Sequence, residues 1–291
     1  DCADFAISTL DAHETMTTLR VGPLRTIKSI AACASVARDG AIIDVDAGDY
    51  VADVAVWLQS DITIRAVGGR VRLLAKGAAA EGKGIWVIRG GRVWVDGFDF
   101  DGAKVASKNG AGIRFEKGHL SVRNCTFANN ENGILTSNHP DAVLTVDNCE
   151  FGYNGHGDGQ SHNLYAGSIA RLTVTDSYFH HAKVGHLLKS RAALTHVINC
   201  RLIDGAEGTA SYELEFPNGG MAFVVGNTIA QSTLTQNQHL ISFGAEGYKW
   251  PRNSLYLANN TLKNPLPFGV FLRVAPGADA VHDIDNVRIG P

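Results

Sequence analysis

The sequence predicts an all-β protein, a right-handed, single-stranded parallel β-helix (a solenoid) with a short helix capping its N-terminal end. Three observations lead to this prediction. A six-residue motif recurs six times, a second short apolar segment precedes each copy, and helical periodicity is absent from these repeats. The composition agrees, because 32 glycines and 8 prolines among 291 residues suit a chain with many tight turns.

The recurring motif defines the coil. An apolar residue is followed two positions later by a turn residue, mostly asparagine, then by a small polar residue or cysteine. Strands of three to five residues at such intervals cannot form βαβ units, so they stack coil on coil, about ten in all. The small residues should then form an inward ladder in which the cysteines are reduced and stacked. They are Cys125, Cys149, Ser177, Cys200, Asn227 and Asn260.

The N-terminal stretch differs from the repeats. Apolar residues at helical spacing over 23–36 predict an amphipathic helix that covers the open end of the solenoid, and Ile42–Val45 is predicted as a strand. We therefore expect a single domain over residues 1–291, with an extension and capping helix to about residue 38 and coils over about 39–290. Cys2 and Cys33 can form a disulfide, which favours a secreted or periplasmic location.

Charge and hydropathy limit the partners. The chain has 26 basic and 29 acidic residues and a net charge of -3, so it lacks the basic field that attracts nucleic acid or a membrane surface. No apolar run approaches the roughly 18 residues that span a bilayer, and the start at Asp1 lacks the features of a signal peptide. We expect a soluble protein, acting as a monomer, without nucleic-acid or membrane partners.

Residue types that catalyse reactions concentrate in the middle coils, where two polar rows are expected. Equivalent residues of neighbouring coils lie about 4.8 Å apart, so each row forms a continuous ladder. Residues three apart face opposite sides of an ideal strand, so both rows face solvent only if the strand bends. The first row contains His162, His186, Tyr212 and His239, and the second contains Tyr165, Lys189, Glu215 and Ser242.

The segment Gly185–Arg191 is the most informative about chemistry. Lys189 and Arg191 lie on one side of an extended strand beside His186, which creates a cationic spot suited to a carboxylated sugar. A neutral lysine can remove the proton α to a carboxylate while arginine or histidine offsets the enolate charge. The segment predicts β-elimination, or the related epimerisation, on an anionic, uronic-acid-containing polysaccharide.

A family resemblance extends this prediction. The helical cap, the turn at 47–50 and the Asn-Cys rungs resemble the pectate-lyase-like β-helix superfamily. Lys189 with the following Ser190 is similar to the lysine-serine strand of alginate lyases and chondroitinase B-type lyases, which implies Lys189 as the catalytic base. Two features depart from that pattern. The acidic calcium ligands expected before the lysine are replaced by residues such as Lys183, and the arginine expected on the following coil is absent from 214–219. Arg191, His186 and Tyr165 are the possible substitutes.

Two alternatives stay open at this stage. Glu213 and Glu215, expected on one side of a strand, or Asp158 can serve a glycoside hydrolase. The sequence Gly-His-Gly at 155–157 resembles a short motif of polygalacturonases, although the aspartate motifs of those enzymes are missing from this chain. The other alternative is a non-catalytic glycan-binding surface protein.

The remaining candidates lie in loops. The glycine-rich loop 152–162 can form a wall beside the site, and its His156 and Asp158 are candidate substrate contacts. With His162 they can also hold zinc, although no cofactor is required and a divalent cation, zinc or calcium, is only an option. Tyr248 and Trp250 can stack on sugar rings or merely plug a loop.

Overall fold

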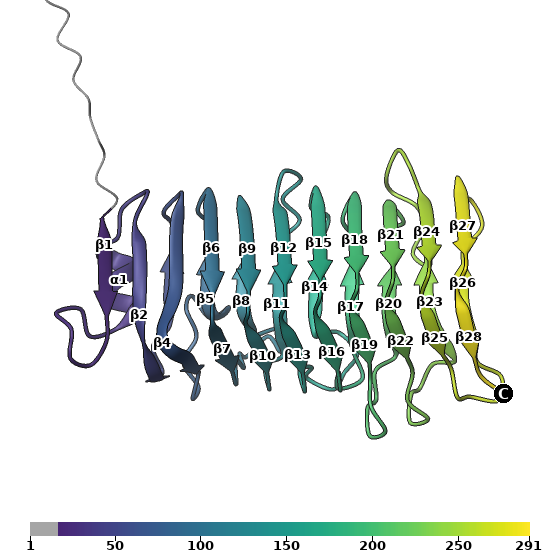
Figure 1. Ribbon diagram of the computed structural model, residues 1–291, viewed down its shortest axis with the longest axis horizontal. Helices are drawn as coiled ribbons and strands as arrows, with labels where there is room; N and C mark the ends of the chain where they lie inside the picture. The colour runs from purple at the N-terminus through teal and green to yellow at the C-terminus, as the bar shows by residue number, and fades with distance from the viewer. Residues whose placement is uncertain (1–16) are drawn as a thin grey trace, which may run out of the picture.

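The computed structural model describes residues 17–291 and confirms the predicted parallel β-helix of about ten turns. Figure 1 shows the coils stacked along one long axis, with helix α1 (Ile30–Val36) at one end and the C-terminus at the other. The strands of the described residues form one sheet of nine strands and one of nineteen. Equivalent strands of successive coils pair in parallel, so each strand has a neighbour 23 to 33 residues away over the predicted repeats.

The nine-stranded sheet receives one strand from each coil, in sequence order. Its members are β3 (Ala55–Trp57), β5 (Gly84–Ile88), β8 (Ala111–Phe115), β11 (Asn132–Thr136), β14 (Leu164–Ala166), β17 (His186–Ser190), β20 (Tyr212–Phe216), β23 (His239–Phe243) and β26 (Val270–Val274).

The nineteen-stranded sheet receives two strands from most coils, a longer one and a shorter one separated by a turn. The first group is β1 (Thr18–Val21), β2 (Ile42–Val51), β4 (Ile62–Leu74), β6 (Arg92–Asp96), β9 (His119–Arg123), β12 (Val143–Asp147), β15 (Arg171–Thr175), β18 (Leu194–Ile198), β21 (Met221–Val225), β24 (Ser254–Ala258) and β27 (Ala280–Ile284). The short strands are β7 (Phe98–Asp101), β10 (Thr126–Ala128), β13 (Glu150–Gly152), β16 (Tyr178–His180), β19 (Arg201–Ile203), β22 (Thr228–Ala230), β25 (Thr261–Lys263) and β28 (Val287–Ile289).

The turn between these two strands explains the recurring asparagines. Asn124, Asn148, Asp176 and Asn199 have φ between 48° and 54°, the left-handed conformation that Asn and Asp tolerate better than most residues. One left-handed residue per coil redirects the chain at the same place, which keeps the coils in register.

The residue after each turn points inward and links one coil to the next. The backbone N–H of Cys125 donates to Cys149 Sγ at 3.4 Å, that of Cys149 to Ser177 Oγ at 3.0 Å, and that of Cys200 to Asn227 Oδ1 at 2.7 Å. Cys125, Cys149 and Cys200 are buried and form no disulfide with one another, which confirms the predicted ladder of reduced thiols. Each of these buried backbone N–H groups therefore has its hydrogen-bond acceptor in the next coil along the sequence.

Aromatic rings fill the interior beside this ladder. The rings of Phe100, Phe127, Phe151 and Phe179 stack nearly parallel, with centroids 4.7 to 4.8 Å apart. This spacing equals the separation of adjacent strands, so identical residues at one coil position pack face to face without strain.

The capping helix is shorter than predicted. The expectation of a helix from residue 23 is wrong, because Ser29 is extended (φ -133°) and α1 begins only at Ile30. Asp53 accepts the N–H groups of Ile30 and Ala31 at 2.6 and 2.8 Å, which fixes the start of the helix there. Leu24, counted in the predicted apolar stripe, is 94% exposed.

Two further expectations concern the ends of the chain. Cys33 lies on the buried face of α1, but the possible Cys2–Cys33 disulfide lies outside the described residues. Helix α1 is seven residues long. Within residues 17–291 no helix has the length and apolar character needed to cross a membrane.

Replacing Asn227 by alanine should destabilise the solenoid by roughly 1–3 kcal/mol, because the buried N–H of Cys200 loses its acceptor. Urea unfolding followed by circular dichroism measures the change. Thr228→Ala, one residue further and partly exposed, is the control and should stay within about 0.5 kcal/mol of the parent. Equal effects of the two variants would contradict the structural role of the ladder.

Candidate functional site

The strands of the nine-stranded sheet bend so that two successive residues point inward. Leu187 and Leu188 are both fully buried in β17. In β11, a Cβ added to Gly133 would lie 2.8 Å from Phe151 Cδ1, so the position before Ile134 also faces the interior. The bend places the residues on either side of the inward pair, His186 and Lys189, on the outer face. Both predicted polar rows therefore face outward, as the sequence required.

The predicted register of these rows is confirmed. Tyr165 pairs with Lys189, Lys189 with Glu215, and Glu215 with Ser242. In the other row His186 pairs with Tyr212. The imidazole and phenol rings of this row contact their neighbours, with centroids 4.4 Å apart for His162 and His186 and 5.1 Å apart for His186 and Tyr212. His239 continues the row at 6.4 Å from Tyr212.

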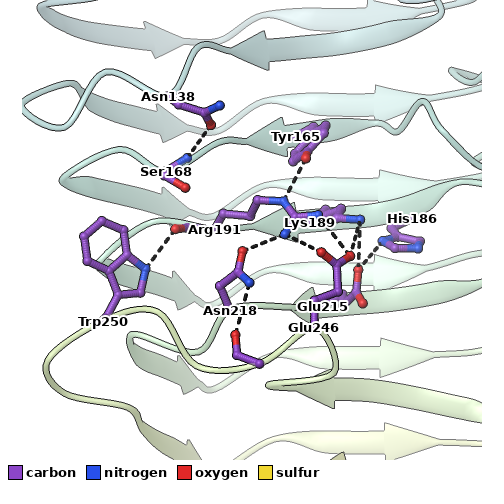
Figure 2. Close-up of polar contacts among 11 residues, drawn as sticks. Asn138, Tyr165, Ser168, His186, Lys189, Arg191, Glu215, Asn218, Glu246 and Trp250 are labelled. Carbon is purple, nitrogen blue, oxygen red and sulfur yellow. Dashed lines mark hydrogen bonds and ion pairs between the residues drawn. The ribbon is translucent and has the colours of Figure 1, made fainter.

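Lys189 and Arg191 form the centre of the site (Figure 2). Arg191 Nε donates to the Tyr165 hydroxyl at 2.8 Å, and its NH1 donates to Asn218 Oδ1 at 2.6 Å. Lys189 Nζ lies 3.4 Å from Glu215 Oε2 and 5.4 Å from the centre of the Tyr165 ring. The two basic side chains are only 12% and 15% exposed. They are held rigidly on the sheet face instead of extending into solvent.

The loop 244–253 supplies a residue that sequence reasoning missed. Glu246 forms a two-pronged ion pair with Arg191, at 2.7 and 3.0 Å, and its Oε1 lies 3.7 Å from Lys189 Nζ. The contact joins residues 55 positions apart, from coils that are not adjacent in sequence. The mixture of aromatic and charged residues in this loop was the only signal, and it did not single out Glu246.

The two buried histidines of the site are neutral at pH 7. Burial lowers the pKa of His162 well below its ordinary value, and the nearby positive charges of Lys189 and Arg191 add to this. His162 Nδ1 accepts the backbone N–H of His186 at 2.9 Å, so its proton is on Nε2. Burial also lowers the pKa of His186, although Glu215 opposes the shift. His162 therefore holds the backbone of β17 through this hydrogen bond from the preceding coil.

Glu215 is the buried anion of the site. Burial alone would raise its pKa, but contacts with His186 and Lys189 outweigh that effect and the pKa lies below its ordinary value. Because His186 is itself neutral, we assign the compensating positive charge to Lys189. His186 Nδ1 lies 3.0 Å from Glu215 Oε2, at an angle too poor for a hydrogen bond, so both buried atoms lack an aligned partner among the described residues.

Glu213 does not share the face of Glu215, so that prediction is wrong. Glu213 occupies the first inward position of the bend, next to Leu214, and is completely buried in the solenoid interior. Its carboxylate oxygens have no hydrogen-bond partner among the described residues, and burial, followed by the charge of Asp204, raises its pKa well above the ordinary value. Leu187 and Leu240 fill the equivalent positions of the adjacent coils. Glu213 therefore cannot contact a polymer on the outer face.

The glycine-rich loop 152–162 reaches the site through His162, whereas His156 and Asp158 have other partners. His156 Nδ1 lies 3.4 Å from Glu131 Oε1, and Asp158 accepts the N–H of Gln160 within the loop itself. His162, in contrast, is buried with Nδ1 engaged. Among residues 17–291, no three His, Cys, Asp or Glu side chains are arranged to hold a metal ion. Binding of zinc or calcium, which the sequence offered only as an option, stays an untested prediction.

Both aromatic residues of the 244–253 loop are engaged in holding it down. The Tyr248 hydroxyl donates to the Ala275 carbonyl at 2.6 Å, and its ring packs against Phe243. Trp250 Nε1 donates to the Arg191 carbonyl at 3.0 Å. These contacts favour the loop-plug interpretation over stacking on sugar rings, and they place Glu246 above the basic pair.

The site is an open stretch of sheet rather than an enclosed cavity. A hollow of about 550 Å³ lies elsewhere, along the left-handed turns, and is lined by residues including Asn148, Glu150, Tyr178 and Arg201. Two of its lining residues make separate contacts, Arg70 with Asp99 and Glu150 with His180. Lys189 and Arg191, which the sequence singled out, do not line this hollow.

Comparison with protein families identifies the chain by its fold. The family described as "Right handed beta helix region" matches residues 63–202 and 112–273, more than half of the chain. The chain belongs to this right-handed β-helix family. No curated protein matches the sequence.

Solved structures with the same fold include enzymes and a viral protein. Pectate lyase Pel9A has 12% sequence identity and a TM-score of 0.56, with 94% of this chain and 80% of that chain covered. The PL6 family alginate lyase AlyGC has 14% identity and a TM-score of 0.56, covering 94% of this β-helix and 39% of that chain. ORF18 of Geobacillus virus E2 has 13% identity and a TM-score of 0.54, covering 90% and 55%. This β-helix thus spans about half of the viral protein, and at these identities the likeness shows the fold alone.

Glu213→Leu should stabilise the protein at pH 7 and weaken its pH dependence. Burial raises the folded-state pKa of Asp204 to about 6, and that of Glu213 well above normal, so the folded chain keeps protons that the unfolded chain has released. The stability that these two carboxyl groups contribute should therefore fall as pH rises from about 4 through 6 and beyond. Thermal melts at pH 4, 6 and 7.5 measure this, with an expected gain of roughly 3 °C or more at pH 7.5.

Glu213→Gln is the matched control for that experiment. Glutamine keeps the shape and polarity of the side chain but does not titrate, so it should flatten the pH dependence without the packing gain of leucine. A difference in melting temperature between the parent and Glu213→Gln that stays constant from pH 4 to 7.5 would contradict the buried, protonated state of Glu213.

Proposed function

We propose that the protein is a polysaccharide lyase that cleaves a uronic-acid-containing glycan by β-elimination, or a related uronate epimerase. One observation carries the proposal. Lys189, Arg191 and Tyr165 converge on the outer face of the nine-stranded sheet, with the Tyr165 hydroxyl 2.8 Å from Arg191 Nε. A base, a carboxylate-binding cation and a proton donor are the three groups that β-elimination needs. Two of the structural neighbours are lyases, which agrees with this choice, but their sequence identity to this chain is low.

Each residue has a defined task in the proposed reaction. Arg191 binds the uronate carboxylate and stabilises the negative charge that develops on it when the adjacent carbon loses its proton. Lys189 takes that proton, the electron pair forms a carbon–carbon double bond, and the bond to the leaving sugar oxygen breaks. Tyr165 accepts a hydrogen bond from Arg191, so its own hydroxyl proton is available for the leaving oxygen.

Lys189 must lose a proton before it can act as a base. In the substrate-free site its side-chain nitrogen lies within 4 Å of the Glu215 and Glu246 carboxylates. Glu215 is buried and fixed on β20 with Oε2 3.4 Å from Lys189 Nζ, so it orients the amine while the proton leaves to solvent. We assign Glu215 a positioning role next to the base.

A glycoside hydrolase is the second candidate, favoured by the pair Glu215 and Glu246. Both carboxylates contact the same Lys189 ammonium, and two neighbouring carboxyl groups are the basic equipment of glycoside hydrolysis. Of the residues predicted for a hydrolase, Glu215 stays a candidate, whereas Glu213 is internal and Asp158 accepts a hydrogen bond within its own loop. A non-catalytic glycan-binding surface is the third candidate.

The proposed substrate is a polymer outside the cytoplasm, so we also propose a secreted or periplasmic location. A monomer suffices for this activity, because Tyr165, Lys189, Arg191, Glu215 and Glu246 all come from one chain.

Lys189→Ala should lower kcat on a uronate polymer by about 100-fold or more, because it removes the base. The assay follows the ultraviolet absorbance of the unsaturated uronate product on alginate, pectate, glucuronan and glycosaminoglycans. Lys263→Ala, an exposed lysine on β25, is the matched control and should keep full activity. A Lys189→Ala enzyme with normal turnover would overturn the assignment.

The product distinguishes the three candidate functions. A lyase releases unsaturated ends that absorb ultraviolet light, whereas a hydrolase releases reducing ends without new absorbance. In the hydrolase case, Glu215→Gln should abolish product formation. Glycan binding without any product, and without epimerisation detected by NMR, would support the non-catalytic alternative.

A further inference from the structure

Glu246 occupies the position on Arg191 that the carboxylate of a bound sugar would take. Its two oxygens accept hydrogen bonds from NH1 and NH2 of Arg191, the two-pronged arrangement in which guanidinium groups bind carboxylates. One of these oxygens also approaches Lys189 at 3.7 Å. Figure 2 shows the Glu246 side chain meeting both basic residues from the loop side. The protein thus supplies its own anion to the cationic pair.

The charges of the site cancel while Glu246 is in place. Lys189 and Arg191 contribute two positive charges, and Glu215 and Glu246 contribute two negative ones. His186 adds none, because burial keeps it neutral. An anionic sugar therefore gains little electrostatic attraction from the intact cluster, whereas removal of the Glu246 carboxylate leaves one net positive charge.

The two carboxylates are anchored very differently. Glu215 projects from β20 and its side chain is 6% exposed, whereas the Glu246 side chain, on a loop, is 47% exposed. The loop backbone is held independently of that side chain. Lys249 N donates to the Asn218 carbonyl at 3.1 Å, and Trp250 Nε1 donates to the Arg191 carbonyl at 3.0 Å. The Glu246 side chain can therefore turn away into solvent without opening the loop.

Arg191 stays oriented when Glu246 leaves. Its Nε remains bonded to the Tyr165 hydroxyl and its NH1 to Asn218 Oδ1. Those bonds hold the plane of the guanidinium group and leave the edge that faces Glu246 free for another carboxylate. A preoriented cation loses less side-chain entropy on binding than a flexible one.

We propose that a uronate binds by displacing Glu246 from Arg191, so that Glu246 sets both the affinity for carboxylated sugars and the discrimination against neutral ones. This rests on the proposed role of Arg191 in binding a carboxylate. A neutral sugar has no group that can replace the Glu246 carboxylate, and it leaves the ion pair intact. A uronate exchanges one carboxylate for another and keeps the cationic pair compensated.

Glu246→Gln tests the displacement directly. Glutamine keeps the size of the side chain but removes the competing charge, so D-glucuronate or D-galacturonate should bind about tenfold more tightly than to the parent. D-Glucose and D-galactose should bind with unchanged affinity. Titration followed by NMR or calorimetry measures each Kd. Glu207→Gln, which removes an exposed charge between β19 and β20, is the matched control and should leave every affinity unchanged.

The outcomes separate this proposal from the proposed function. Uronate affinity that is equal or weaker in Glu246→Gln, an equal gain for neutral sugars, or no uronate binding by either protein would overturn the displacement. Because binding is measured without turnover, a tenfold gain supports the displacement even if no polymer yields unsaturated product. Conversely, lyase activity with unchanged Kd values would leave the proposed function standing and remove the role of Glu246. A thermal melt of each variant confirms that it is folded.

Discussion

Parallel pairing of every coil with the next is the constraint on which the rest of this structure depends. Each strand pairs with its equivalent in the next coil, so a side chain stands directly over the side chain one repeat away. Inside, this stacks phenylalanine rings and links turn residues by hydrogen bonds. Outside, it places Tyr165, Lys189 and Glu215 next to one another although they are 24 to 26 residues apart in sequence.

The bend in the nine-stranded sheet determines which polar residues reach the surface. Because two successive residues point inward, Glu213 faces the hydrophobic interior while Glu215, two residues later, faces the basic pair. The two carboxylic acids consequently differ in charge state, since burial without a partner keeps Glu213 protonated and the contacts of Glu215 keep it ionised. Two glutamates only two residues apart therefore have opposite pKa shifts.

The site combines strong local charges with no net charge. Two basic and two acidic side chains compensate one another on the outer face, one acid fixed on a strand and one carried by a loop. Such an arrangement holds Lys189 and Arg191 in place before a ligand arrives, which reduces the entropy lost on binding. A carboxylate is the group proposed to replace Glu246, which agrees with the proposed uronate substrate.

The sequence by itself determined the coil, the inward thiol ladder and the register of the two polar rows. Those features repeat, and a repeat shows which residues are equivalent without knowledge of distances. Lys189, Arg191 and Tyr165 could therefore be placed together from spacing alone. The length of the capping helix was predicted less well, because Asp53, from a later segment, fixes where α1 starts.

Only the tertiary structure decided the inward orientation of Glu213 and the arrival of Glu246 at Arg191. An ideal strand alternates its side chains, and the bend that breaks this alternation comes from how the coil closes around its core. Glu246 lies in a loop outside the repeat, so neither periodicity nor motif spacing relates it to a residue 55 positions earlier. Repetition carries positional information along the chain, whereas a single loop contact depends on the path of the folded backbone.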